Sequence, residues 1–261
     1  MNSLHSLQSG LQITNCLMKY KESKVFDFIQ GEILVVNKPL DWTSNDLVQK
    51  IRNTLCRLMK IKKLKLGHAG TLDPKATGVM VLCSGKLTKK IDEIQADEKE
   101  YVAVLKVGAT TPSFDTETEE DEQFPTTHIH RETVENVLPL FLGNIEQIPP
   151  DYSAVKVDGK RAYKLARKGT EMELKPKLLV IKEIELLRFE LPEIELRIVC
   201  SKGTYIRALA RDIGKALDSG AYLIGLKRTR IGEFTIEQSL DLTELADLLS
   251  AYFQHNNSKN I

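Results

Sequence analysis

One loop of this sequence gathers side chains that can do chemistry. Two glycines bound a polar stretch that contains an imidazole, hydroxyls and a carboxylate: Gly67-His68-Ala69-Gly70-Thr71-Leu72-Asp73-Pro74-Lys75-Ala76-Thr77-Gly78. Pro74 disfavours helical geometry at Asp73, so the carboxylate is predicted to lie on a shaped loop between a basic helix and an apolar strand. Such loops commonly carry function. A second interpretation stays open, in which the glycines are ordinary turn residues and Asp73 accepts hydrogen bonds from its own loop.

Two familiar enzyme classes fit the sequence poorly. Gly85-Lys86 follows an apolar strand, but a phosphate-binding P-loop would need Gly where Met80 stands and Ser or Thr where Leu87 stands. A Ser-His-Asp hydrolase would need a G-x-S-x-G turn, which is absent, and His68 and Asp73 share one loop without an evident serine partner. Nucleoside-triphosphate hydrolysis is therefore rejected, and serine hydrolysis is poorly supported.

The cysteines and histidines do not form a metal or disulfide pattern. The four cysteines are far apart and include no C-x-x-C pair: Cys16, Cys56, Cys83 and Cys200. They are interpreted as reduced thiols packed as small hydrophobes, which favours a cytoplasmic location. His128 and His130 lie beside an acidic run and are interpreted as surface residues. No metal and no organic cofactor is predicted.

The composition is that of an ordinary globular protein, with 42% hydrophobic and 28% charged residues. No apolar run approaches the roughly 18 residues that a membrane-spanning helix needs. Residues 1–24 lack the basic start, continuous apolar block and cleavage site of a secretory signal. Neither a membrane protein nor a secreted protein is expected.

The charge distribution says more than the net charge of +1, which by itself argues against a polyanion partner. Acidic residues gather at 117–122. The basic residues form separate clusters, which are Arg52, Arg57, Lys60, Lys62, Lys63 and Lys65; Lys86, Lys89 and Lys90; residues 161–168; and Lys227, Arg228 and Arg230. This separation is compatible with one basic face, although any single cluster could be a solvated helix surface.

Hydrophobic periodicity outlines the elements that must position the loop. Strands are predicted at 32–37, 79–83, 101–107, 152–157, 178–189, 193–200 and 221–230. Helices are predicted from Thr43 to Leu58 and at 133–142, 161–168, 204–217 and 240–253. The sum predicts an α/β or α+β fold with a mixed, largely antiparallel sheet and flanking helices.

The chain is predicted to hold one catalytic domain at 25–253, because no repeat, linker or shift in composition marks a second. Residues 1–24 are expected to be a poorly ordered extension, with Met18 as a possible true start, and residues 254–261 a polar tail.

Here a family resemblance adds to the residues. The loop resembles the G-H-x-G-T-L-D-P-x-A-T-G motif of the TruB family of tRNA pseudouridine synthases. The other matching segments follow in family order and are Asn37-Lys38-Pro39, Lys99-Glu100-Tyr101, Pro149-Pro150-Asp151-Tyr152-Ser153-Ala154-Val155-Lys156, Cys200-Ser201-Lys202-Gly203-Thr204-Tyr205-Ile206-Arg207 and Leu226-Lys227-Arg228-Thr229-Arg230. The similarity spans about residues 30–245, nearly the whole chain.

The resemblance implies the pseudouridine synthase fold and a cofactor-independent isomerase. Its substrate would be uridine 55 in the T loop of transfer RNA, recognised mainly by the shape of the folded T arm. The reaction breaks the C1′–N1 bond and rejoins the ring through C5, which calls for a nucleophile, and a carboxylate suits that role. By similarity Asp73 is the nucleophile; attack at C1′ and initial removal of a C2′ proton both stay open. Arg207 would pair with Asp73, which keeps the carboxylate ionised and aimed.

The resemblance also assigns residues around the target base, which must be turned out of its stack to be reached. Tyr101 would stack on the base and transfer a proton, and Tyr205 and Leu226 would line the pocket. His68 would contact the rearranged RNA loop, and Lys38 would lie near the pocket floor. Taken singly, each aromatic residue would more often be a core residue. The helix from Arg52 to Lys65 is placed to meet phosphates.

The chain departs from the family pattern in two places. Many members carry a C-terminal PUA-type RNA-binding domain, and the roughly twenty residues after Leu240 are too few for a complete one. Where members show a T-D-T-x-D-like run, this chain has Thr111-Pro112-Ser113-Phe114-Asp115.

Two alternatives remain beside the tRNA enzyme. The protein could be an RNA-binding or tRNA-folding protein with incidental catalysis, or a pseudouridine synthase that acts on another RNA. A monomer is the default expectation.

Overall fold

The structure is a computed structural model that describes residues 25–153, 155–157, 159–166, 170 and 172–258. The expected N-terminal extension, residues 1–24, lies outside the described residues. Within them, one nine-stranded sheet has the order β1-β3-β12-β4-β11-β10-β7, with β2 beside β3 and β13 beside β12. β12 pairs in parallel with β3, and the other pairings of this sheet are antiparallel. The predicted mixed, largely antiparallel sheet with flanking helices is confirmed.

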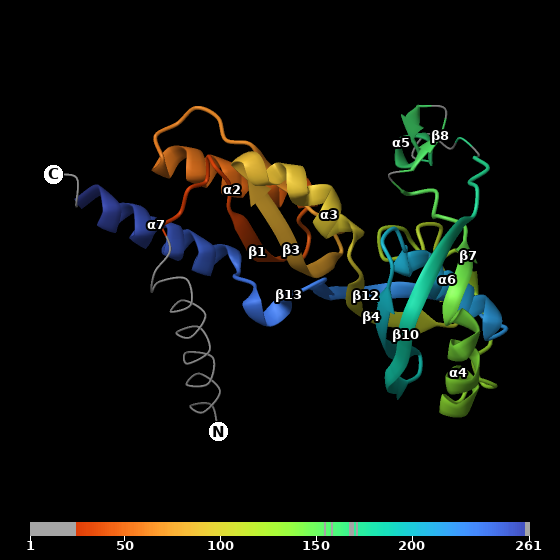
Figure 1. The fold of residues 1–261 in the computed structure, drawn as a ribbon. Coiled ribbons are helices and arrows are strands. Elements are labelled where there is room, and N and C mark those ends of the chain that lie inside the picture. Colours follow the sequence, from red (N-terminus) through yellow and green to blue (C-terminus); the bar gives the residue numbers. More distant parts are fainter. Residues whose placement is uncertain (1–24, 154, 158, 167–169, 171, 259–261) are drawn as a thin grey trace, which may run out of the picture.

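The strands are β1 (Ile33–Lys38), β2 (Leu66–His68), β3 (Ala76–Ser84), β4 (Lys99–Val107), β5 (Ala109–Thr110), β6 (Glu122–Gln123), β7 (Gly143–Gln147), β8 (Lys156–Val157), β9 (Lys160–Arg161), β10 (Lys177–Glu190), β11 (Glu193–Cys200), β12 (Ala221–Ile231) and β13 (Phe234–Thr235). The helices are α2 (Ser44–Leu58), α3 (Ile91–Ala96), α4 (Arg131–Val137), α5 (Ala162–Ala166), α6 (Ile206–Ala216) and α7 (Leu242–Ser258), with 3-10 turns η1 (Gly85–Lys90), η2 (Leu138–Phe141) and η3 (Ile236–Gln238). In Figure 1, α2, α3 and α7 gather at the β1–β3 end of the sheet and α4 and α6 at the other.

At the β1–β3 end, the sheet is covered on both faces. Because successive side chains of a strand alternate between faces, each strand contributes to two apolar clusters. The side chains that pack with α2 and α7 include Leu34, Val36, Met80 and Leu82. Those that pack with α3 include Val35, Val79 and Val81. This part of the sheet is therefore a rigid support for the loop between β2 and β3.

At the other end, α4 and α6 cover one face of the sheet. Every second residue of β4 is buried against them, from Tyr101 to Val107. The intervening residues are partly exposed, and the two charged ones form ion pairs, Glu100 with Arg197 at 2.8 Å and Lys106 with Glu120 at 2.6 Å. The strand pattern of buried and charged residues follows from this one-sided cover.

Helix α2 begins where the sequence predicts. Thr43 Oγ1 accepts from Asp46 N, and Asp46 Oδ2 accepts from Thr43 N, both at 3.0 Å. This reciprocal capping satisfies donors that the first turn leaves free. The buried stripe matches the predicted helical spacing and contains Leu47, Val48, Ile51 and Leu55.

Three predicted elements are interrupted or shorter in the described residues. The helix predicted at 133–142 is α4 followed by η2, because Pro139 cannot donate the backbone hydrogen bond of a continuing α-helix. The strand predicted at 152–157 is limited to β8, and residues 154 and 158 lie outside the described residues. The helix predicted at 161–168 is α5, with residues 167–168 also outside them.

The last helix continues into the segment interpreted as a polar tail. α7 ends at Ser258, beyond the 253 boundary inferred from the sequence. Two of its aromatic rings hold it to the first described residues, because Tyr252 packs edge-on against Phe26 with centroids 4.8 Å apart and Phe253 stacks on Phe28. This contact joins the first and last segments of the described residues, and hydrophobic periodicity within either segment does not predict it. No helix in the described residues is long and apolar enough to cross a bilayer.

Candidate active site

Asp73 lies on the loop that joins β2 to β3, and its neighbours are tied to the start of α2. The Ser44 hydroxyl donates to the Leu72 carbonyl and accepts from the Leu72 N–H, both at 2.9 Å. On the other side of Asp73, the Asp41 N–H donates to the Pro74 carbonyl at 2.9 Å. Among the described residues, no hydrogen bond joins the Asp73 carboxylate to its own loop, so the loop is not a self-satisfied turn.

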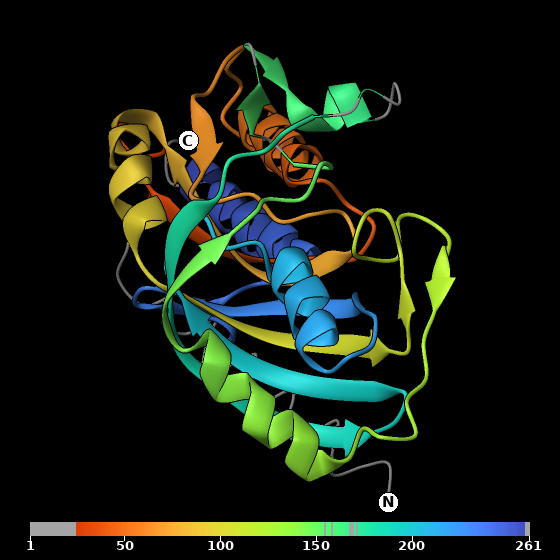
Figure 2. The same ribbon diagram turned by 90° about the vertical axis from the view of Figure 1, so that its right-hand side faces the viewer.

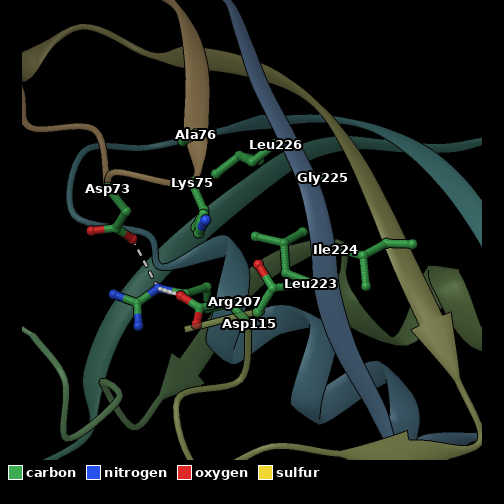
Figure 3. Close-up of a pocket in the computed structure, with 10 residues that line it drawn as sticks. Asp73, Lys75, Ala76, Asp115, Arg207, Leu223, Ile224, Gly225 and Leu226 are labelled. Carbon is green, nitrogen blue, oxygen red and sulfur yellow. Dashed lines mark ion pairs between the residues drawn. The ribbon is translucent and has the colours of Figure 1, made fainter. Parts of the chain in front are cut away.

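The carboxylate of Asp73 instead meets Arg207, which is in the first turn of α6. Arg207 Nε lies 2.8 Å from Asp73 Oδ2 and 3.4 Å from Asp115 Oδ2 (Figure 3). The other guanidinium nitrogens donate to the carbonyls of Ser113 and Tyr152 at 3.1 and 3.0 Å. The Arg207 side chain is 6% exposed, whereas that of Asp73 is 40% exposed. A buried, fully engaged cation thus aims a carboxylate that a ligand can still reach.

Asp115 completes this site, and sequence reasoning did not single it out. The side chain is buried, and its Oδ1 accepts from Ser113 Oγ at 2.6 Å and from Glu117 N at 2.9 Å. These two donors hold the carboxyl group so that Oδ2 faces Arg207. The one signal in the sequence that could have pointed to Asp115 was the run at 111–115, which departs from the family pattern.

The charged cluster forms one end of a pocket, and apolar residues form the rest of its wall. The lining residues are Asp73, Lys75, Ala76, Asp115, Thr116, Arg207, Leu223, Ile224, Gly225 and Leu226. Figure 3 shows the β12 residues across the pocket from the Asp73–Arg207 pair. The register of β12 against β4 shifts between Leu223 and Gly225. Such a bulge re-aims side chains locally. The arrangement places a carboxylate beside an apolar wall in a narrow pocket, which a flat group would have to widen to enter.

Comparison with known proteins shows the family to which the chain belongs. A family model described as TruB family pseudouridylate synthase (N terminal domain) matches residues 57–206, more than half of the chain. The chain belongs to the TruB family of pseudouridylate synthases. A second model, described as tRNA pseudouridylate synthase B C-terminal domain, matches residues 207–260.

Relatives in the TruB family resemble this chain over most of their length. It is 65% identical over 223 residues to tRNA pseudouridine synthase B of Parabacteroides distasonis, covering 85% of this chain and 95% of the relative. It is 63% identical over 221 residues to the protein of that name from Bacteroides fragilis, with the same coverage. A crystal structure of a Cbf5-Nop10-Gar1 complex has a TM-score of 0.64 at 27% identity, covering 88% of this chain and 57% of that chain. This chain therefore spans a little over half of that protein.

Lys38 of this TruB-family chain lies behind the loop and outside the pocket lining. Its side chain is fully buried, and Nζ donates to the carbonyls of Pro39, Trp42 and Pro74 at 2.8, 2.6 and 3.3 Å. Burial lowers the pKa of Lys38 to about 8, although the nearby Asp73 charge opposes this shift. The ammonium group thus holds the residue that follows Asp73.

Tyr101 and His68 are close to the Asp73 loop, yet neither lines the pocket. Tyr101 is 8% exposed and packs in the same apolar cluster as Leu72 and Ala76. Burial raises the pKa of its hydroxyl, and the positive charge of Arg228 opposes this. His68 is half-buried in β2, and burial lowers the pKa of its imidazole. Its Nδ1 is buried and has no hydrogen-bond partner among the described residues.

Tyr205 positions the start of α6, because its main chain forms two hydrogen bonds with one buried amide. The Tyr205 N–H donates to Gln147 Oε1 at 2.9 Å, and Gln147 Nε2 donates to the Tyr205 carbonyl at 3.2 Å. Gln147 ends β7 and is 1% exposed. This pair fixes the helix turn that carries Arg207, and the Tyr205 ring does not line the pocket.

Of the residues that the sequence singled out, the structure brings Asp73, Arg207 and Leu226 together in one pocket. Lys38, His68, Tyr101 and Tyr205 surround that pocket without lining it. His128 and His130 are exposed, as predicted. The described residues contain no group of three or more His, Cys, Asp or Glu side chains placed to hold a metal ion.

Proposed function

We propose that this protein isomerises uridine 55 in the T loop of transfer RNA to pseudouridine, with Asp73 as the nucleophile. The observation that carries the proposal is the partly exposed Asp73 carboxylate, held by the buried Arg207 at the edge of an apolar pocket. The two relatives described above support the substrate class, since both are named tRNA pseudouridine synthase.

The geometry suits the bond changes of the reaction. The C1′–N1 bond breaks, the ring turns, C5 bonds to C1′, the proton on C5 is lost and N1 gains a proton. Asp73 can start this by attacking C1′ or by removing the C2′ proton. Arg207 does not react in either route; its charge-assisted hydrogen bond keeps the carboxylate aimed at the ribose.

The target uridine must leave its stack to reach Asp73, and the apolar wall of the pocket can receive it. Leu223 and Leu226 supply that wall in the structure. In the proposal Tyr101 stacks on the base and moves a proton, Tyr205 extends the wall, and His68 contacts the rearranged RNA loop. Because Tyr101 is covered, its contact with the base requires the residues over it to move.

A lysine-rich surface supports an RNA partner. It comprises the exposed residues Lys60, Lys62, Lys63, Lys65, Lys86, Lys89 and Lys90. The two segments that carry them meet where the Gly85 N–H donates to the Lys65 carbonyl at 2.9 Å. Within the described residues, none of these lysines forms an ion pair. Both ribbon views place α2, η1–α3 and the β8–α5 segment on the same side of the molecule (Figures 1 and 2). Phosphate contacts there would position RNA without reading its sequence.

The test is site-resolved mapping of pseudouridine in a T-arm hairpin after incubation with the protein, without added metal or nucleotide. Wild-type protein should convert the T-loop uridine alone. Asp73→Asn should bind the hairpin with unchanged affinity and convert none. Asp92→Asn is the matched control, because Asp92 is exposed on α3 and lies outside the site. Conversion by Asp73→Asn at the wild-type rate would contradict the role of Asp73.

A second candidate function is pseudouridine formation in another RNA. The observation in its favour is the fold shared with a solved H/ACA RNP bound to a substrate RNA, at 26% identity and a TM-score of 0.63. That similarity covers 56% of that chain. Product in ribosomal RNA with none in the hairpin would select this alternative. Tight hairpin binding without product in any RNA would select the RNA-binding or tRNA-folding protein.

A further inference from the structure

Arg228, in β12, is a fully buried cation that donates to main-chain carbonyls and whose charge also acts on the neighbouring Tyr101 hydroxyl. It is 1% exposed and ranks among the largest fully buried side chains of the described residues. Its Nε donates to the Val79 carbonyl at 2.8 Å, and Nη2 donates to the Gly70 carbonyl at 3.0 Å. Nη1 lies 3.5 Å from the Thr71 carbonyl. No ion pair with a carboxylate is found for Arg228 within the described residues.

Removing a guanidinium from water without a carboxylate partner is costly, so the carbonyl contacts must replace its hydration. Two of the three carbonyls belong to residues 70 and 71, just before Asp73, and the third belongs to β3. Arg228 therefore connects the Asp73 loop to the central strands of the sheet. This connection spans up to 158 positions of sequence.

Two glycines lie against Arg228, and one of them is needed for its approach. Gly78 has φ +106, and a Cβ there would overlap the main chain of Arg228. Gly70 has φ +104, and the Arg228 guanidinium passes 3.5 Å from where its Cβ would be. Both backbone conformations favour glycine, and both positions face the same arginine. Arg228 therefore accounts for the need for glycine at position 78, whereas at position 70 the backbone conformation favours it.

We infer that Arg228 is a positioning residue for the reaction. It holds the backbone of residues 70 and 71, just before Asp73, so that the carboxylate stays aimed at the ribose. This inference rests on the proposed role of Asp73. Arg207 holds the carboxylate from the α6 side, while Ser44 holds Leu72 and Lys38 holds the carbonyl of Pro74. The carbonyls of residues 70 and 71 are left to Arg228. Arg228 lies outside the pocket lining, so its proposed role is to position the loop.

Arg228→Lys tests the inference because it keeps the charge and removes the planar fork. One ammonium group cannot reach carbonyls in the three directions that the guanidinium serves. The single-turnover rate at saturating hairpin RNA should fall about 10- to 100-fold, because an error of about 1 Å in placing a reacting group can cost that much. The dissociation constant of the hairpin should stay unchanged. Hydrogen exchange should quicken at residues 70–73 and stay unchanged in α2 and α7.

Arg230→Lys is the matched control, because Arg230 is two residues further along β12 and pairs with Glu98 at 2.8 Å on the outer side of the sheet. It should keep the wild-type rate. A wild-type rate for Arg228→Lys would overturn the inference, as would a slower rate explained entirely by weaker RNA binding or by a smaller folded fraction.

If Arg228→Lys does not fold, Gly70→Ala is the second variant, because it strains the loop at the guanidinium without removing a buried charge. Its rate should fall with unchanged RNA affinity, and a wild-type rate would overturn the inference. Failure of the proposed function is a separate outcome, since wild-type protein would then make no pseudouridine.

Discussion

The substitution Asp115→Asn isolates the second carboxylate of the site. Asn has nearly the same size, and its Oδ1 can still accept from Ser113 Oγ and Glu117 N. The change therefore removes a negative charge from beside Arg207 and little else. With Oδ1 held by its two donors, the new Nδ2 would point at Arg207 Nε, which lies 3.4 Å from Oδ2 in the native protein. Two donors would then face each other.

The expected magnitude follows from what Arg207 keeps. Breaking a buried ion pair outright costs about 3–5 kcal/mol, but Asp73 would still pair with Arg207 at 2.8 Å. Asp115 Oδ2 forms no hydrogen bond within the described residues, so the loss is instead that of a buried amide left facing another donor, about 2 kcal/mol of unfolding free energy. For a chain of this size that lowers Tm by about 4–8 °C. Arg207 would also be free to shift, so the single-turnover rate should fall about 10- to 100-fold.

The assay is single-turnover conversion of the T-arm hairpin at saturating protein, beside urea denaturation of the same preparation. Asp247→Asn is the control, because Asp247 is exposed on α7, and its stability should change by less than about 0.5 kcal/mol. If Asp115→Asn keeps both the wild-type rate and the wild-type stability, the reasoning that Asp115 holds Arg207 is wrong. Lost stability with a wild-type rate would make Asp115 structural only.

Two further predictions concern buried titratable groups. Raising the pH through about 8 should slow the wild-type reaction, because the pKa of Lys38 is lowered to about 8 and a neutral amine has two donors for three carbonyls. The contribution of Lys38 to the free energy of unfolding should rise over the same range. Between about pH 8 and pH 10.5 Lys38 is protonated in the unfolded chain and mostly neutral in the folded one, so the unfolded state binds more protons. pH–rate profiles check the expected loss of rate, and urea denaturation checks the expected change in stability. If the rate of Lys38→Arg falls with pH in the same way, another group causes the loss. Burial raises the pKa of Cys83 and Cys200 to about 11, so both thiols should resist iodoacetamide at pH 8 until the protein is unfolded. Rapid labelling of either of these two cysteines in the folded protein would contradict their burial.

Local physics explains what the sequence could predict. The start and buried stripe of α2 follow from the Thr43–Asp46 capping pair and helical spacing. Pro74 places Asp73 on a loop, and alternation identifies β4 and its buried face. The sequence motifs and their order indicate the TruB family, and matches to two TruB family models confirm it. In each case the deciding interactions lie within a few residues of chain, so they can be recognised without knowing the fold.

The family resemblance already indicated Arg207 and Leu226 near Asp73, whereas the other residues around it are decided by the tertiary structure alone. Strand β12 lies between β3 and β4, and this crossover brings Arg228 to Gly70 across 158 positions. Asp115 reaches Arg207 only because the 111–115 turn packs beside the start of α6. Tyr101, which is expected to stack on the base, is 8% exposed and packs among core residues, and local sequence does not reveal this burial. Burial and long-range ion pairing depend on how strands are ordered and stacked, and the one-dimensional pattern of residue types does not contain that order.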